Sequence, residues 1–450
     1  MKIFKICTYF FSFVHSSKFI ILLFFMSTHK INSNHISMSF NNSRSLSLLP
    51  ENASKEQIVS YLIETDFTVD MKVGINPQIV PMSLSLWNKY VYITSNSLDI
   101  GVYDKDKSLS FTTNNEEPLG DKNYFRKGLY CNETFIFDSD KNIINENTSF
   151  ILTTQMEYDS EYRKGLIGFQ ITSYKEEDTL VNQLKSKDII NNYYHFLLFE
   201  GEDIGKFVMG ASPHELNPKK FPYDNFRQVG ARQISQSWEL SMSNIKYGET
   251  KFDDKIFSLD YRFGLISVGV TMKHEYYNDF FEKRIKSGVC DEFLNNDEYY
   301  IYSCINDDKK VKFKELKDFH FYNYGLEFDF IFTYKDLFIT FNNRKYFLIT
   351  YKLNSMTTIF GKPFFRKYTT VFNPDNKQIG IYIKEEETND KSNKIYEKNM
   401  ILLIVIIILI IVLIILGIFF FKLFGRKKRK NELDDNYDYV PEEKNIINTE

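Results

Sequence analysis

The sequence lacks an excess of charge of either sign. Its 450 residues include 56 Lys and Arg against 59 Asp and Glu, a formal net charge of -3 at pH 7. Because the basic residues form no stripe outside the C-terminal end, the sequence argues against nucleic acid as a partner. Hydrophobic residues make up 43% and aromatic residues 17% of the chain, which predicts a folded protein with a large core.

Motifs of the common cofactor and nucleophile chemistries are also absent. The sequence holds no H-E-x-x-H, G-x-S-x-G, C-x-x-C or P-loop pattern. The histidines of its central part are scattered without metal-ligand spacing, and we interpret each as a structural or surface residue; they are His195, His214, His274 and His320. We therefore expect no metal and no small-molecule cofactor.

Long hydrophobic runs are missing from most of the chain, and the two that occur lie near its ends. A short apolar run at 19–26, preceded by lysines, predicts a signal peptide over residues 1–35, with a signal anchor as the alternative. Residues 400–421 carry no charge, and about 20 apolar residues span a ~30 Å hydrocarbon core, so we predict a transmembrane helix there. The basic segment that follows predicts that residues 422–450 form a cytoplasmic tail.

This pattern is that of a single-pass type I membrane protein of the secretory pathway, located at the cell surface or on an endolysosomal membrane. Residues 36–63 would be a pro-segment or linker, and residues 385–399 a stalk. Four N-x-S/T sequons begin at Asn41, Asn52, Asn132 and Asn147. A luminal ectodomain predicts N-glycans at such sequons, and we expect them at Asn52, Asn132 and Asn147.

The secretory route also favours disulfides. Cys290 and Cys304 enclose a short polar segment, where a disulfide would order a loop that cannot bury enough surface by itself. Cys131 is left over, as a buried free thiol or as half of an intermolecular bridge.

Short alternating or β-branched runs predict strands from about residue 64 onward. They lie at 67–73, 90–96, 134–140, 149–155, 206–212, 237–245, 337–341, 346–353 and 369–374. Helical patterns occur only at 178–190, 275–288 and 314–319. We expect an all-β architecture with a few short helices and two lobes, residues 64–232 and 233–384.

Residues 73–93 of the first lobe contain three short motifs in a fixed order. Val73-Gly74-Ile75-Asn76-Pro77-Gln78 is followed, seven residues after Gln78, by Ser85-Leu86-Trp87-Asn88 and then by the apolar Tyr90-Val91-Tyr92-Ile93. This order resembles that of the pepsin-like aspartic proteases, in which an Ile-Gly-Thr-Pro-x-Gln turn precedes Asp-Thr-Gly-Ser and an apolar strand. By this resemblance, Ser85 stands where the family has its first catalytic aspartate.

Further motifs continue the resemblance over residues 64–384. In the second lobe, Asp260-Tyr261-Arg262 falls where the family has its second Asp-Thr-Gly, so the acid is retained and the Thr-Gly is replaced. The other matching segments are Gly165-Leu166-Ile167-Gly168-Phe169, Leu180 to Leu184, Gly205 to Gly210, Ser237-Trp238-Glu239-Leu240, the Cys290 and Cys304 pair, Ile359 to Tyr368, Val371-Phe372-Asn373 and Ile379 to Tyr382. The resemblance implies a bilobal pepsin-like β-barrel or sandwich with an interlobe cleft.

Peptide hydrolysis by this family needs two carboxylates that share one proton, one acting as base and the other polarising the scissile carbonyl. Asp260 alone cannot form such a pair with Ser85. Asp70 and Asp99 are the nearest other acids in the sequence, and neither falls at a loop tip. Tyr124 is a misplaced candidate for the tyrosine of the family's flap.

These departures predict an inactive pseudo-protease that binds a peptide or protein partner through the interlobe cleft. Trp87 would either fill the space of the missing pair or belong to the core. The alternatives are an active membrane-anchored aspartic-type endopeptidase with an atypical site, and a structural or adhesive surface protein.

Overall fold

The computed structural model describes the central part of the chain. The described residues are 34–96, 102–113, 119–121, 126–138, 143–156, 165–171, 179–232, 236–295, 298–353 and 357–383. Within these ranges, no helix has both the length and the apolar character needed to cross a membrane. The predicted signal peptide, except for its last two residues, and the predicted stalk, membrane span and tail lie outside the described residues.

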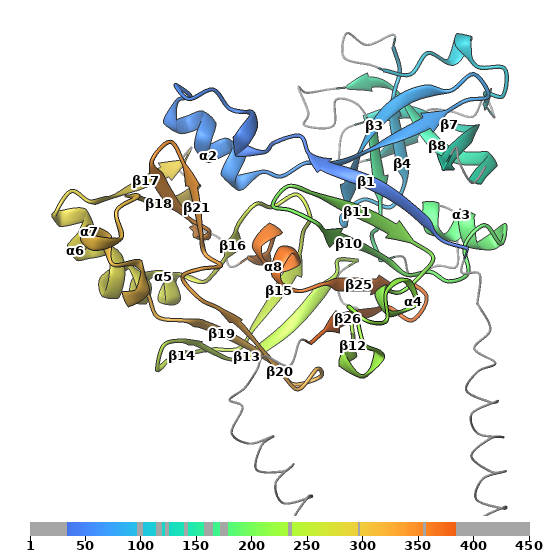
Figure 1. Cartoon of the computed structure of the whole chain (residues 1–450). Helices are drawn as coiled ribbons and strands as arrows, with labels where there is room; N and C mark the ends of the chain where they lie inside the picture. Colours follow the sequence, from blue (N-terminus) through green and yellow to red (C-terminus); the bar gives the residue numbers. More distant parts are fainter. Residues whose placement is uncertain are drawn as a thin grey trace, which may run out of the picture. The chain divides into compact units, whose positions relative to one another are not determined.

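Strands of two sheets are the main secondary structure of the described residues, as predicted for an all-β protein (Figure 1). The alternation in β2 (Phe67–Val73) is typical: Phe67, Val69, Met71 and Val73 are buried, while Asp70 is exposed. The first sheet runs in the order β12 (Phe226–Gly230), β26 (Gln378–Tyr382), β25 (Thr370–Asn373), β10 (His195–Phe199), β11 (Ile204–Met209), β1 (Ile36–Asn42), β2, β3 (Gln78–Ser85), β9 (Gly165–Gly168), β4 (Val91–Thr94), β8 (Ile143–Met156), β7 (Arg126–Asp138) and β5 (Thr112–Thr113), with β6 (Leu119–Asp121) on β7.

The second sheet contains the strands of residues 239–360. Its order is β20 (Phe328–Phe332), β19 (Phe319–Asn323), β13 (Glu239–Tyr247), β15 (Lys255–Leu259), β24 (Thr358–Phe360), β16 (Ile266–Ser267), β23 (Ile349–Lys352), β18 (Tyr299–Ile305), β22 (Arg344–Phe347) and β21 (Phe338–Phe341), with β14 (Thr250–Phe252) on β13 and β17 (Cys290–Asn295) on β18. The two sheets therefore divide the chain between residues 230 and 239, and β25 and β26 return to the first sheet.

The helices are short. They are α2 (Lys55–Ile63), α3 (Leu180–Ser186), α4 (Pro213–Leu216), α5 (Val270–Tyr276), α6 (Glu282–Lys286), α7 (Asp308–Val311) and α8 (Lys362–Lys367), with a π-helical segment, Tyr277–Phe281, between α5 and α6. The helix predicted at 178–190 is α3, and the one predicted at 275–288 begins earlier, after Gly269, because Met272 adds a buried position. The helix predicted at 314–319 is wrong: a 3-10 turn (Phe313–Glu315) leads into β19, where alternating buried phenylalanines favour a strand.

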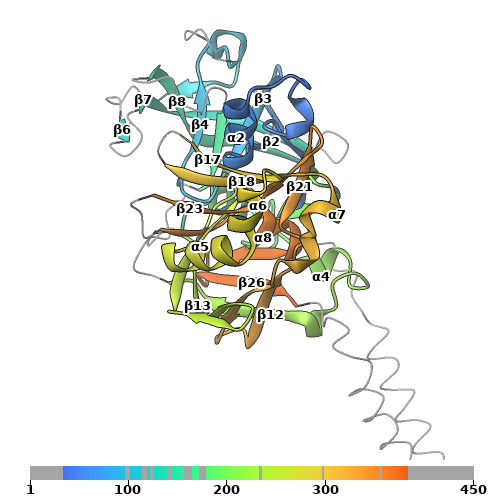
Figure 2. The same ribbon diagram turned by 90° about the vertical axis from the view of Figure 1, so that its left-hand side faces the viewer.

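Residues 36–63, predicted as a pro-segment or linker, contribute a strand and a helix to the fold. β1 lies inside the first sheet, between β11 and β2. Helix α2 begins with a capping box in which Ser54 and Gln57 exchange hydrogen bonds. Its apolar face packs on the second lobe, above the β17–β18 hairpin (Figure 2).

The predicted disulfide is confirmed. Cys290 and Cys304 face each other across β17 and β18 and are joined by a disulfide bond. Cys131 is a buried free thiol, as in the first of the two interpretations of this residue.

Candidate functional site

Ser85 ends strand β3, where it pairs with Gly168 of β9. The side chain is fully buried. Its hydroxyl donates to Oδ1 of Asn88 at 2.7 Å and accepts a hydrogen bond from the backbone N–H of Trp87 at 3.2 Å. Both the proton and a lone pair of this hydroxyl are therefore engaged within the loop of residues 85–90, which we call the first loop.

Asp260 follows β15 in the second lobe, in the loop of residues 260–265, which we call the second loop. Its backbone N–H donates to the carbonyl of Phe360 at 3.2 Å. Its carboxylate Oδ1 accepts from the backbone N–H of Arg262 at 2.9 Å. The side chain is partly exposed. In both loops, then, the residue two positions after Ser85 or Asp260 donates its N–H to that side chain.

Each loop rests on a glycine from another strand segment. A Cβ on Gly168 would lie 2.3 Å from the carbonyl oxygen of Asn88, and a Cβ on Gly361 would lie 2.0 Å from that of Phe263. These contacts are with backbone atoms, which cannot move aside, so both positions require glycine.

The residues that directly follow Ser85 and Asp260 are apolar or aromatic and point into the core. Leu86 and Tyr261 are buried, and the Tyr261 ring packs edge-on against Phe365 and Phe372, at 4.8 and 5.8 Å between ring centroids. The Tyr261 hydroxyl has no partner among the described residues, and burial raises its pKa well above the ordinary value. Neither side chain can hold a carboxylate in place.

Backbone groups of the second loop are bonded by the segment that follows α2. The Thr65 hydroxyl donates to the carbonyl of Tyr261 at 2.5 Å, and the Thr65 N–H donates to the carbonyl of Arg262 at 2.8 Å. Gly264 donates to the carbonyl of Ile63 at 2.7 Å. The sequence did not predict this contact, because its only signal is the threonine that precedes β2.

The other acids considered do not complete the site. Asp70 is exposed on β2 and faces away from the core. Asp99 and Tyr124 lie outside the described residues. Within those residues, no group of histidine, cysteine, aspartate and glutamate side chains is arranged to hold a metal ion.

Trp87 is partly exposed, and its ring packs against the main hydrophobic core. Its indole N–H is buried and has no partner in the described part of the chain. This packing favours the core interpretation of the residue.

An aromatic layer lies directly beneath both loops. His195 of β10 stacks between Phe169 and Phe372, at 4.6 and 5.3 Å between ring centroids, with Trp238 edge-on at 6.1 Å. Phe169 donates its N–H to the carbonyl of Ser85 at 2.8 Å, and its own carbonyl accepts from the Trp238 indole at 2.7 Å. Burial lowers the pKa of His195 to about 3. The sequence places His195 among scattered histidines, and nothing in it signals this environment.

An ion pair also joins two segments that are distant in sequence. Lys362, at the start of α8, pairs with Asp203, which also accepts from Asn42 and from Ser45. Burial works against the charge of Asp203, but the lysine and the hydrogen bonds outweigh it, so its pKa is lowered.

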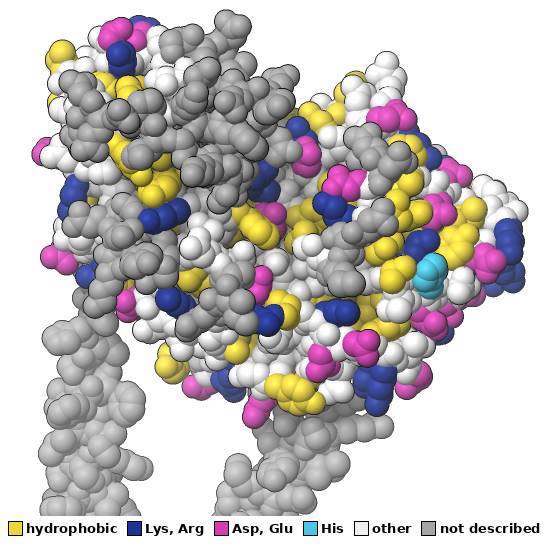
Figure 3. Space-filling model, turned by 180° about the vertical axis from the view of Figure 1, so that it is seen from behind, with side chains coloured by type: hydrophobic (Ala, Val, Ile, Leu, Met, Phe, Trp, Pro, Cys, Tyr) yellow, Lys and Arg dark blue, Asp and Glu magenta, His cyan; other side chains and the backbone are white. Residues whose placement is uncertain are grey.

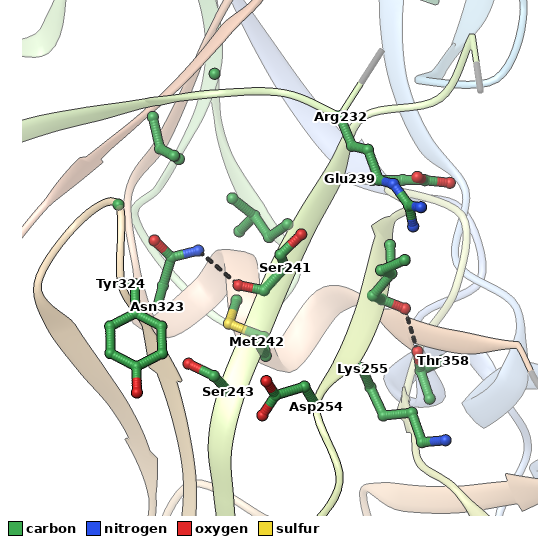
Figure 4. Close-up of a pocket in the computed structure, with 15 residues that line it drawn as sticks. Arg232, Glu239, Ser241, Met242, Ser243, Asp254, Lys255, Asn323, Tyr324 and Thr358 are labelled. Atoms are coloured by element: carbon green, nitrogen blue, oxygen red, sulfur yellow. Dashed lines mark hydrogen bonds between the residues drawn. The ribbon is translucent and has the colours of Figure 1, made fainter. Parts of the chain in front are cut away.

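A cavity of about 650 Å³ opens at the other end of β15, bounded by β12, β13 and the turn between β19 and β20 (Figure 4). Neither Ser85 nor Asp260 lines it. The Asn323 amide donates to the carbonyl of Ser241 inside it. Four charged residues line it: Asp254 and Lys255 are exposed, and Arg232 and Glu239 are partly exposed. We therefore assign the candidate site to the two loops and not to this cavity.

Comparison with protein families returns a single description. The family model "Eukaryotic aspartyl protease" matches residues 83–382. The matched range begins two residues before Ser85, includes Asp260 and ends in β26. No curated protein matches the chain.

Proposed function

Since the chain belongs to the eukaryotic aspartyl protease family, we propose that it is a pseudo-protease, which binds a peptide or protein segment in its interlobe cleft without cleaving it. We also propose that it is a single-pass type I membrane protein with this domain on the luminal or extracellular side.

The observation that carries the proposal is that a hydrogen-bonded serine, Ser85, stands where the family has its first catalytic aspartate. Its hydroxyl is buried and donates to Asn88. A neutral serine hydroxyl cannot act as the base toward water that the first carboxylate of the family provides. Asp260 then has no second carboxylate at the matching position of the first loop, so a shared proton is not available to it.

The features that support binding are those that the loops retain. Both loops keep their glycine support and the N–H contact to the catalytic-position side chain. Trp87 and Arg262 stand where the family has glycines, and both are partly exposed. Arg262 suits contact with a bound polypeptide, because arginine is favoured in such interfaces, whereas the Trp87 ring packs against the core.

The proposed location is supported by the apolar segment 400–421 and by sequons that are accessible. Asn41, Asn52 and Asn147 are exposed, whereas Asn132 is partly buried and accepts a hydrogen bond from Ser149. We expect glycans at Asn52 and Asn147, which lie in a turn and in a left-handed backbone position. Loss of a mass shift on glycosidase treatment, after Asn→Gln changes at these two sites, checks this expectation.

The test of the function is a digest of a complex peptide library at acidic pH by the purified full chain, next to Asp260→Ala and Ser85→Asp variants. A pseudo-protease leaves the library intact in the wild type and in Asp260→Ala, while the library binds to immobilised protein. Cleavage by the wild type that disappears in Asp260→Ala would instead identify an active endopeptidase and overturn the proposal. The Ser85→Asp variant shows whether the first acid alone is missing.

A further inference from the structure

The aromatic layer beneath the loops contains an ionisable group that the proposed function does not use. His195 is 1% exposed, and neither of its ring nitrogens has a hydrogen-bond partner among the described residues. A neutral imidazole normally donates from one nitrogen and accepts at the other, so leaving both unpartnered in a core is costly.

The aromatic rings that contact His195 in the described part of the chain are uncharged. They are Phe169 after β9, Trp238 before β13 and Phe372 on β25, and its cross-strand neighbour on β11 is Met209. Tyr194 and Phe196, on either side along β10, belong to the cluster on the opposite face of the sheet. On the far side of this layer, Tyr261 of the second loop packs against Phe372, and burial keeps Tyr261 neutral by raising its pKa.

A proton on His195 would therefore place a cation, with two N–H donors and no acceptor, inside an apolar layer. Burying an unpaired charge in this way is strongly unfavourable. A state in which the layer has opened and water reaches the ring accepts the proton readily.

The layer joins both loops. Phe169 is hydrogen-bonded to the backbone of Ser85 and to the Trp238 indole, and Phe372 packs against Tyr261 of the second loop. Any opening around His195 moves supports of the first loop and of the second loop together.

We propose that His195 is an acid-sensitive latch: when it takes up a proton, the aromatic layer opens, the two loops lose their common support, and the cleft releases the peptide it holds. The release step rests on the proposed function, whereas the opening of the layer does not.

The size of the pH effect on opening follows from the different affinities of the closed and open states for the proton. With the ring titrating at about 3 in the closed state and near 6.5 when exposed, the closed-to-open ratio falls roughly 25-fold between pH 7 and pH 5. Because the closed pKa lies below the open one, the closed state loses stability as the pH falls below about 6.5.

The experiment uses the tryptophans as reporters. The chain has two tryptophans, so the full chain with Trp87→Phe emits from Trp238 alone, 6.1 Å from His195. We expect a red shift of its emission on acidification, and loss of this shift, or its displacement by at least about one pH unit, in His195→Phe. His274→Gln changes an exposed histidine and is the matched control, which should titrate as the parent does.

An unchanged acid transition in His195→Phe overturns the proposal. If that variant fails to fold, His195→Leu replaces it, and hydrogen exchange of the wild type gives an independent measurement: amides of β10 and β25 should lose more protection between pH 7 and pH 5 than those of β18 and β22, which contain no histidine, after correction for intrinsic rates. Equal loss in both regions contradicts the latch.

Release is measured with a displayed library of random peptides, bound to the immobilised full chain at pH 7 and washed at pH 5. At least tenfold greater elution from the wild type than from His195→Phe supports the proposal. Peptides that stay bound to the wild type at pH 5 contradict it and leave the proposed function standing. Absence of any binding at pH 7 contradicts the proposed function, while the fluorescence result still decides whether the latch exists.

Discussion

The first and second loops share a framework and differ in chemistry. In each, a strand ends at or directly before Ser85 or Asp260, the residue two positions on donates an N–H to that side chain, and a glycine from a distant segment supports the backbone. The first loop holds a buried hydroxyl whose proton goes to Asn88, and the second holds a partly exposed carboxylate.

The difference teaches that backbone and chemistry can change separately in this fold. The backbone contacts of both loops depend on glycines and main-chain groups, which leave the catalytic side chain free to vary. The surrounding side chains suit this arrangement: Asn88 provides the acceptor that a serine hydroxyl needs, and Leu86 and Tyr261 are buried in the core.

The two glycines that support the loops should give the largest change in stability when they are replaced. Gly361→Ala and Gly168→Ala should each lower the free energy of unfolding by about 3 kcal/mol or more, since the added methyl group meets carbonyl oxygens at 2.0 and 2.3 Å. Urea unfolding of the full chain measures this. Gly230→Ala is the matched control, because nothing lies within 4 Å of its Cβ position. A small effect at only one of the two supports would show that the loops are not held alike.

The lobes also differ in their cysteines: the second lobe has the disulfide, and the first has the free thiol of Cys131. Removing the disulfide should have the second largest effect on the free energy of unfolding. Replacing Cys290 and Cys304 together by alanine should lower the free energy of unfolding by about 3 kcal/mol, for a loop closed by residues 14 apart in sequence. A reducing agent should lower the unfolding midpoint of the wild type and leave that of the double variant unchanged. If the reducing agent lowered both midpoints equally, the effect would not come from this bond.

Replacing the side chain of Ser85 or of Asp260 should lower the free energy of unfolding by less than the glycine and cysteine replacements do. Ser85→Ala leaves the buried Trp87 N–H and the Asn88 oxygen without their partner, which we expect to cost about 1–2 kcal/mol. Asp260→Asn keeps an acceptor oxygen for the Arg262 N–H at a partly exposed site, so less than about 1 kcal/mol is expected. Thermal or urea unfolding of the two variants gives the order, and the opposite order would contradict the assigned hydrogen bonds.

The smallest effect concerns pH in the second lobe. His320 on β19 is bonded to Asp329 at 2.7 Å, and this hydrogen bond raises the pKa of the histidine. The pair therefore stabilises the fold below the unfolded pKa near 6.5, and the contribution disappears as the pH rises through the folded pKa. Because the site is partly exposed, about 0.5 kcal/mol is expected. Comparing His320→Asn with the wild type at pH 5.5 and pH 8 measures it, and its sign is opposite to that at His195.

Local signals predicted much of this fold. The strand at 67–73 matches β2, the disulfide follows from two cysteines close in sequence, and motif order led to the family and to the positions of Ser85 and Asp260. These features depend on alternation, spacing or neighbours within a few residues.

Features made by distant partners were not predicted. β1 is a strand because Ile36 pairs with Met209 in β11 and Phe40 with Val69 in β2. The surroundings of His195 come from four different segments of the chain, and a single histidine in a strand carries no sign of them. The role of Asn88 could have been predicted, since a polar side chain three residues after a serine can accept a hydrogen bond from its hydroxyl.

The position of β25 and β26 has a consequence for biosynthesis. These strands belong to the sheet of the first lobe and lie between β10 and β12, yet they are made last among the described strands, with β10 paired to residues more than 170 positions later. The first sheet of a nascent chain must therefore wait, with the edges of β10 and β12 open, until the second lobe has been synthesised. Such long-range closure is slow and leaves strands exposed to wrong pairing, so the yield of this protein should depend on chaperones that cover those edges before residue 370 emerges.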